Sequence, residues 1–161
     1  MTETQHNVIA RRPALRLDRR GFTIIELMTV ITVMSSLAAI AVSRTQATID
    51  LAKVARAIGD IRAIQVDIVG YQSAGQALPA GLVDVGRDQL LDPWGRPYVY
   101  VNFSLGGSHR TDRFGVDLNT EFDVYSQGPD GGSATSLSAG ASQDDVVRAN
   151  DGGFIGKGSK F

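Results

Sequence analysis

A single carboxylate, Glu26, interrupts an otherwise apolar run over residues 22–42 of the 161-residue chain. A charge inside a lipid bilayer costs a few kcal/mol, so an acid in a membrane segment marks a functional site by default. Just before the run, Gly21 joins Phe22 to a basic segment. Such a carboxylate is costly unless a positive charge pairs with it, so the chemistry to look for is a cationic partner for Glu26.

The rest of the sequence offers little catalytic chemistry. The chain has no cysteine, which excludes thiol catalysis and a disulfide framework. The two histidines, His6 and His109, are too few and too far apart for a metal site or a catalytic triad. No phosphate-binding loop, dinucleotide motif or nucleophile elbow occurs. The net charge of −1 gives no global argument for nucleic-acid binding. We therefore predict that the chain is not an enzyme and does not bind nucleic acid.

The first 42 residues read as a leader and a membrane segment. Residues 1–21 carry five arginines against Glu3 and Asp18. The apolar run that follows has 21 residues and gives roughly 31 Å of helix, enough to cross the hydrocarbon core. By the positive-inside rule, the basic leader predicts a cytoplasmic N-terminus. A secretory signal peptide with an A-x-A site at residues 39–41, or a plain signal anchor, remains the alternative interpretation.

The helix is predicted to continue beyond the apolar run. No proline or glycine occurs from residue 22 to residue 58. Apolar residues then recur at spacings of three and four, which indicates an amphipathic half over residues 43–75. We expect one helix over about 22–73, whose stripe packs on the region 76–161. The stripe consists of Leu51, Val54, Ile58, Ile61, Ile64, Ile68 and Tyr71.

Residues 76–161 have the composition of strands and loops. Two stretches rich in aromatic and β-branched residues, 98–103 and 121–127, predict strands. We expect Trp94 and Tyr98 to pack against the long helix. The stretch 128–161 contains eight glycines and few large apolar residues. It cannot form a core of its own, so it is expected to be loop held by its neighbours or by an ion, or else disordered.

The sequence GFTIIELM at residues 21–28 resembles the processing motif of type IV pilin-like proteins. In that family a prepilin peptidase cuts after the glycine and N-methylates the new first residue, which would be Phe22. The glutamate at the fifth position of the mature chain, here Glu26, is a hallmark of the family. The resemblance covers residues 20–42 and implies cleavage between Gly21 and Phe22. The new α-amino group on Phe22 would have an ordinary pKa of about 8 and would be mostly cationic at neutral pH. In the filament that the resemblance implies, the Glu26 carboxylate of one copy could then neutralise the Phe22 amine of its neighbour.

The C-terminal half resembles one branch of that family. LDPWGRPY at 91–98, FDVYSQGPDGG at 122–132 and DDV at 144–146 are similar to segments of the major pseudopilin of type II secretion systems, the general secretion pathway protein G family. The resemblance implies an α+β fold, a long N-terminal helix packed on a small antiparallel sheet, with calcium pinning the C-terminal loop. Carried over by position, the ligand role falls on Asp130 and Asp145, with Asp144 and Ser133 as further candidates. Solvated turn acids remain the alternative, because Asp-Gly is a common turn pair.

The function implied by the resemblance is mechanical. The subunit would sit in the bacterial inner membrane with its C-terminal domain in the periplasm, then polymerise into a pseudopilus that drives export of folded proteins across the outer membrane. Its partners would be further copies, minor pseudopilins, an assembly platform, a secretin and the prepilin peptidase. The alternative is a type IV pilin of a surface fibre for adhesion, motility or DNA uptake. A signal-anchored periplasmic binding domain is the competing class.

Overall fold

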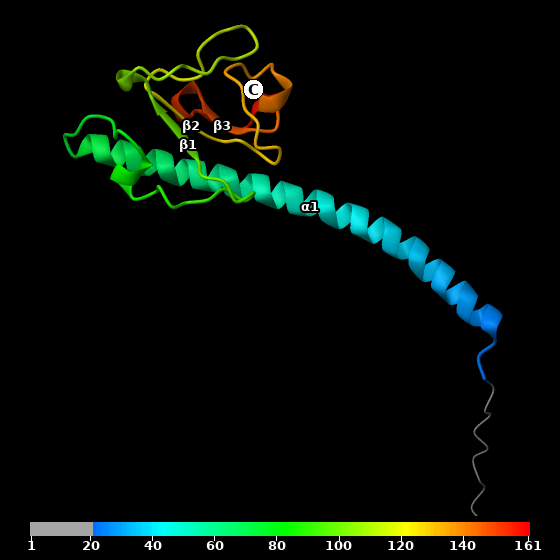
Figure 1. The fold of residues 1–161 in the computed structure, drawn as a ribbon. Coiled ribbons are helices and arrows are strands. Elements are labelled where there is room, and N and C mark those ends of the chain that lie inside the picture. Colours follow the sequence, from blue (N-terminus) through cyan, green and yellow to red (C-terminus); the bar gives the residue numbers. More distant parts are fainter. Residues whose placement is uncertain (1–20) are drawn as a thin grey trace, which may run out of the picture. The chain divides into compact units, whose positions relative to one another are not determined.

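The computed structural model describes residues 21–161, apart from the side chains of residues 42–44. The leader predicted over residues 1–21 therefore lies outside the described residues, except for Gly21. The described residues divide into two compact units, one that ends at residue 42 and one over residues 43–161. One helix, α1 (Ile24–Ser73), belongs to both units (Figure 1). The prediction of a single long helix is confirmed.

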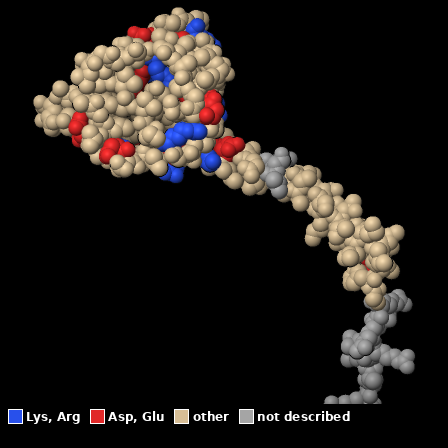
Figure 2. Space-filling view, in the orientation of Figure 1, with Lys and Arg blue, Asp and Glu red and all other residues tan. Residues whose placement is uncertain are grey.

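The described part of the first unit consists almost entirely of the apolar half of α1. Its polar side chains bond within the helix: four hydroxyls donate to carbonyl oxygens three or four residues earlier, at 2.7–3.0 Å. Such bonds satisfy the hydroxyl groups where no water is present. The stretch is long and apolar enough to cross a membrane, and none of it is buried inside the chain. In the space-filling view it is almost free of charged side chains (Figure 2). The four hydroxyls belong to Thr29, Thr32, Ser35 and Ser36.

In the second unit, the head, α1 packs against a sheet and builds the main core. Ile61, Ile64 and Ile68 are fully buried against the sheet residues Phe122 and Val124. Each buried isoleucine contributes about 1.5–3 kcal/mol relative to an exposed one. The predicted stripe is confirmed over this stretch, and Val54 and Ile58 are partly buried at its start. The prediction was wrong for Leu51, which is 71% exposed because the head begins to cover the helix only after it.

Four antiparallel strands form one sheet in the order β1-β2-β3-β4. They are β1 (Val99–Asn102), β2 (Phe122–Ser126), β3 (Val146–Ala149) and β4 (Phe154–Lys157). The sheet and the long helix confirm the predicted α+β fold (Figure 1). Within residues 21–161, four short 3₁₀ helices occupy the connections and a fifth follows β4: η1 (Leu82–Val85), η2 (Phe103–Leu105), η3 (Gly140–Ser142), η4 (Asn150–Gly152) and, after β4, η5 (Gly158–Lys160).

The glycine-rich tail is more regular than its composition suggests. The sequence predicted loop or disorder after residue 128, whereas β3 and β4 both lie in that tail. Successive side chains of a strand point to opposite faces, so Val146 joins the core against α1 while Val147 joins a second cluster. Leu118 and Leu137 complete the second cluster from the loops. The tail thus has no core of its own, but its strand β3 lies between the main core and the second cluster.

Candidate functional site

The segment before α1 is open and places few demands on its residues. Gly21, Phe22 and Thr23 precede the helix and are not helical. Phe22 is 82% exposed in the isolated chain. A Cβ added at Gly21 would meet no atom within 4 Å, and its φ is not positive. The fold therefore does not itself require glycine at residue 21.

Thr23 caps the start of α1 and fixes the position of Glu26. The backbone N–H of Glu26 donates to Thr23 Oγ1 at 3.2 Å, and the N–H of Leu27 donates to the Thr23 carbonyl oxygen, also at 3.2 Å. Thr-x-x-Glu is the spacing of a capping box. Glu26 lies in the first turn, where a carboxylate is favoured by the positive end of the helix dipole. Sequence reasoning missed Thr23, although this spacing was readable from the chain.

In the head, the two segments that carry the family resemblance bond to each other. Asp92 accepts hydrogen bonds from the backbone N–H groups of Trp94 and Arg96 at 3.0 and 2.9 Å, which closes the turn. Its other carboxylate oxygen accepts from the Ser126 hydroxyl at 2.5 Å. The Arg96 guanidinium donates to the Gly128 carbonyl oxygen at 2.7 Å. The turn at 91–97 therefore holds the loop that follows β2.

Two glycines of that loop are required by its geometry. Gly128 has a φ of 64° and Gly131 a φ of 71°, in the left-handed region that side chains disfavour. A Cβ at Gly131 would lie 2.5 Å from the Arg96 guanidinium carbon, and one at Gly128 would lie 2.6 Å from the carbonyl oxygen of Asp144. The glycines allow the loop to lie against both the turn and the segment around residue 144.

The loop acid Asp130 closes its own turn. It is exposed, and its Oδ1 accepts a hydrogen bond from the N–H of Gly132 at 2.7 Å. Its backbone N–H donates to Asp144 Oδ2 at 3.3 Å. The loop after β2 and the segment before β3 therefore meet at these two acids. The contact joins the backbone of Asp130 to the side chain of Asp144.

Asp145 is fully buried and already faces a cation. Its Oδ2 accepts from the Arg110 guanidinium at 2.6 Å and from the Ser133 hydroxyl at 2.7 Å. The same guanidinium carbon lies 4.0 Å from the centre of the Tyr125 ring. Burial raises the pKa of Asp145, and the bonds from Arg110 and Ser133 oppose that rise. Nothing in the spacing of residues 110 and 145 indicated this ion pair.

The three predicted calcium ligands do not gather into one cluster. Within residues 21–161, no group of three or more histidine, aspartate or glutamate side chains is placed to hold a metal ion. Two of their oxygens, Asp144 Oδ1 and Asp145 Oδ1, are nevertheless buried without a hydrogen-bond partner, as are Nε and Nη1 of Arg110. Buried acceptors are normally paired. A hard cation prefers such oxygens, and calcium would need backbone carbonyls or water to complete its six to eight ligands.

Polar residues on the flank of α1 fasten the head to the helix. The Tyr98 hydroxyl donates to Asp60 at 2.8 Å, and the Arg87 guanidinium donates to Asp67 at 2.6 Å. The packing of Tyr98 against the helix was predicted, and Trp94 is likewise packed on the core. Asp60 and Asp67 are both half-buried. They lie at the edge of the buried stripe, within reach of its loops.

Comparison with known proteins agrees with both resemblances. The family described as "Prokaryotic N-terminal methylation motif" matches residues 16–42. The chain is 33% identical over 137 residues to "Type II secretion system core protein G" of Pseudomonas aeruginosa. That alignment covers 72% of this chain and 87% of the Pseudomonas protein. No solved structure matches the chain.

Proposed function

The chain belongs to the core protein G family of type II secretion systems, the major pseudopilins, and we propose on this basis that its copies polymerise into a periplasmic filament that drives export of folded proteins across the outer membrane. The observation that carries the proposal is the identity of 33%, which extends over 87% of the relative and so includes the head as well as the N-terminal motif. Membership of a family of structural subunits favours a mechanical role over an enzymatic one. A surface pilin has no comparable support.

The first step of this function is processing at the N-terminus. A prepilin peptidase would cut between Gly21 and Phe22 and methylate the new amine. The open, non-helical segment before α1 supports this, since a peptidase must bind an extended chain. The basic leader supports a cytoplasmic N-terminus and a periplasmic head. Mass spectrometry of the mature protein tests the step: the first peptide should begin with N-methylated Phe22, and a chain that begins at residue 42 would indicate a secretory signal peptide instead.

The second step is assembly through the apolar halves of α1. In the filament, the Phe22 amine of one subunit would face the Glu26 carboxylate of another, surrounded by apolar side chains. A charge buried in this way is costly unless it is paired, so the pair favours one register between neighbouring helices. Minor pseudopilins, the inner-membrane assembly platform and the secretin would act at the ends of the filament.

Calcium is proposed as a structural ion of the head. Asp144 and Asp145 would hold it through their unpartnered oxygens, joining the loop after β2 to the start of β3. Asp130, whose carboxylate closes its own turn, would contribute less. Such an ion would supply positive charge to Asp144 and Asp145 without taking part in any reaction.

A thermal melt of the full chain in detergent tests the calcium site. At a calcium concentration a hundredfold above its Kd, removing the ion with a chelator should cost about 2.7 kcal/mol, or roughly 10 °C in Tm. Asp144→Asn should abolish this difference, while the matched variant Asp130→Asn should keep it. If the chelator leaves the wild-type Tm unchanged, the Arg110 guanidinium is the only cation that Asp145 needs.

The function itself is tested by deletion of the gene. Deletion should abolish release of the exported proteins and leave twitching motility and DNA uptake intact, and the wild-type gene supplied on a plasmid should restore release. Normal secretion in the deletion strain would contradict the proposal. Loss of motility or DNA uptake instead would indicate a surface pilin.

A further inference from the structure

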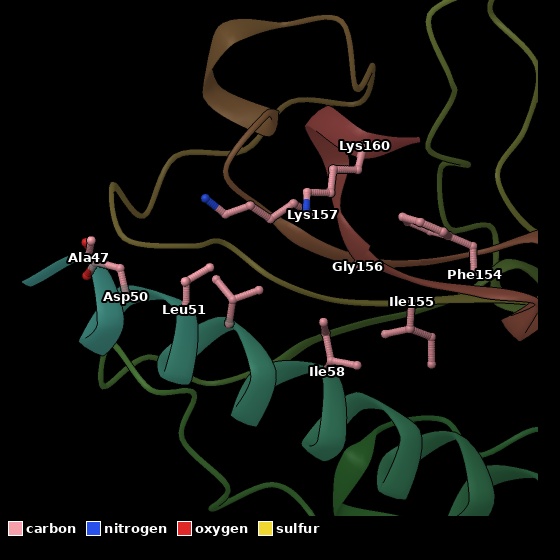
Figure 3. Close-up of a pocket in the computed structure, with 10 residues that line it drawn as sticks. Ala47, Asp50, Leu51, Ile58, Phe154, Ile155, Gly156, Lys157 and Lys160 are labelled. Atoms are coloured by element: carbon pink, nitrogen blue, oxygen red, sulfur yellow. The ribbon is translucent and has the colours of Figure 1, made fainter. Parts of the chain in front are cut away.

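The head has an apolar groove where the sheet meets the N-terminal part of its helix. The groove measures about 660 Å³ and is lined by Leu51, Val54 and Ile58 of α1 and by Phe154 and Ile155 of β4. Figure 3 shows Leu51 and Ile58 on the helix facing Ile155 on the strand. Lys157 and Lys160 lie on the strand side and Asp50 on the helix side. We call it the base groove. Its size is in the range of sites that bind whole ligands, and its floor is apolar while its edge is mostly basic.

A second surface of the head presents apolar residues on a rigid turn. Residues 112–117 form this turn, which we call the tip turn. Asp112 accepts hydrogen bonds from the N–H groups of Phe114 and Val116 at 2.7 and 2.9 Å, and its own N–H donates to the Val116 carbonyl oxygen at 2.8 Å. Phe114 is 75% exposed, more than any other large apolar side chain described in the head, and Val116 is 61% exposed. A turn fixed in this way loses little entropy when it binds.

The two surfaces complement each other in polarity and in charge. The tip turn carries Asp112, Arg113 and Asp117 around its apolar pair, a net charge of −1, whereas Asp50, Lys157 and Lys160 give the base groove a net charge of +1. Asp117 is well exposed, with its side chain 57% accessible. The lysines of one surface therefore have acidic counterparts on the other, and Asp50 has a counterpart in Arg113.

From this complementarity we propose that the base groove of one subunit receives the tip turn of a neighbouring copy, with Phe114 and Val116 inserted between α1 and β4. The contact joins two different surfaces of the same chain. Contacts of that kind do not close into a two-fold dimer, and when repeated they generate open helical filaments unless the rotation closes a ring. The inference rests on the proposed function, because it assigns an interface within the pseudopilus to named residues.

Crosslinking of the full chain in assembled filaments tests the contact. The protein has no native cysteine, so each introduced thiol reports one position. Leu51→Cys lies in the groove and Val116→Cys on the tip turn. Under mild oxidation the double variant should form a ladder of covalent multimers, while each single variant should stay monomeric. Filaments that mix the two single variants should contain crosslinked dimers made of one variant of each kind.

The matched control replaces the tip cysteine by one at Val83, which is 64% exposed and so as accessible as Val116. Leu51→Cys with Val83→Cys should give no ladder. A ladder from that control, or dimers from Leu51→Cys alone, would overturn the proposal by showing a different copy in the groove. Normal filaments without any crosslink would also overturn it and would leave the groove to another occupant, such as a phospholipid. If the wild-type chain forms no filament at all, the proposed function fails instead.

Charge reversal gives an independent test. Lys157→Glu with Lys160→Glu should lower the amount of filament severalfold, since the two introduced carboxylates then repel the acids of the tip turn. Adding Asp117→Lys in the same chain should restore it, because every subunit offers both surfaces. Adding Asp88→Lys, which reverses an exposed acid elsewhere on the head, should not restore it. Rescue by both substitutions, or by neither, would contradict the specific contact.

Discussion

The start of α1 combines two roles, capping of the helix and charge pairing with a neighbouring subunit. Replacing Thr23 and Glu26 one at a time separates these roles. Thr23 caps the helix through the N–H of Glu26 at 3.2 Å, while the Glu26 carboxylate is the proposed partner of a neighbouring amine. Glu26→Gln removes the charge and keeps a residue that is also favoured at this position of a capping box. Thr23→Ala removes the cap and keeps the charge. We expect the first variant to lose filament assembly and the second to retain it.

The expected magnitudes of the two substitutions differ enough to be told apart. Loss of a threonine cap costs about 0.5–2 kcal/mol, and it affects the single subunit and the filament alike. Two unit charges 4 Å apart attract by about 4 kcal/mol at an effective dielectric constant near 20. Removing one partner of a buried pair costs about 3–5 kcal/mol, because the other charge is left buried alone. Glu26→Gln should therefore weaken each addition of a subunit by roughly a hundredfold to several thousandfold.

The assay compares three variants at equal expression: Glu26→Gln, Thr23→Ala and the charge-conserving Glu26→Asp. Membrane fractionation shows whether each one inserts, and mass spectrometry shows whether each one is cleaved and methylated. Sheared filaments and the exported proteins in the medium measure assembly. All three variants should insert, and only Glu26→Gln should lack filaments while it is processed normally.

Two results would refute this reasoning. Normal filaments from processed Glu26→Gln subunits would show that assembly needs no charge at residue 26. Equal loss of filaments in Glu26→Gln and Thr23→Ala would show that the helix start matters only as a cap. Membership of the family would stand in either case, because it rests on the alignment and not on this contact.

Three further predictions concern the head. Tyr98→Phe should lower its free energy of unfolding by about 1.5–3 kcal/mol in chemical denaturation, because the lost hydroxyl donates to a carboxylate on α1 at 2.8 Å; an unchanged midpoint would contradict that bond. Stability should also fall above about pH 10: burial raises the pKa of Tyr100 to about 12 and raises that of Tyr98, so the unfolded chain releases these protons first. Each phenol contributes its full stabilisation below the unfolded-state pKa of about 10. As the pH rises from there toward the pKa of the folded state, that contribution should fall by up to about 1.4 kcal/mol per pH unit. Chemical denaturation at a series of alkaline pH values measures this fall. Gly131→Ala should cost about 1–2 kcal/mol, since its φ is 71° and a Cβ would meet Arg96, whereas Gly140→Ala, where a Cβ would meet nothing within 4 Å, should cost little; equal melting temperatures would refute the close approach.

The long helix and its stripe were predictable because their signals are local. An uninterrupted run without proline or glycine extends the helix, and spacings of three and four place Ile61, Ile64 and Ile68 on one face. Leu51 fits the same spacing but is exposed, since periodicity gives a face and cannot tell how far the head extends along it. The position along α1 at which the head stops packing on the helix depends on β4, which lies about a hundred residues later in the chain.

The strands of the tail could not be predicted because their signals are short and mixed with glycine. β3 and β4 have four residues each, and they pair with each other and with β2 through contacts that no local pattern encodes. The ion pair of Arg110 and Asp145 joins residues 35 apart in sequence, and only the folded chain brings them together. The family resemblance assigned the calcium ligands to acids of two loops, and the structure adds which of their oxygens are bonded and which are left without a partner.

The placement of Glu26 meets the separate demands of the free and the assembled subunit. In the free subunit, a carboxylate in the first turn gains about 0.3–1 kcal/mol from the helix dipole and lies near the end of the apolar run, where a membrane charge costs least. After cleavage the new amine would be four residues away, which is about 6 Å along the axis if α1 extends back to Phe22 in the filament. A neighbour displaced by roughly one turn then brings its carboxylate level with that amine. A carboxylate one turn deeper would lose the dipole and the cap and would need twice the displacement. The two demands therefore select the first turn, and the same side chain can be tolerated before assembly and required during it.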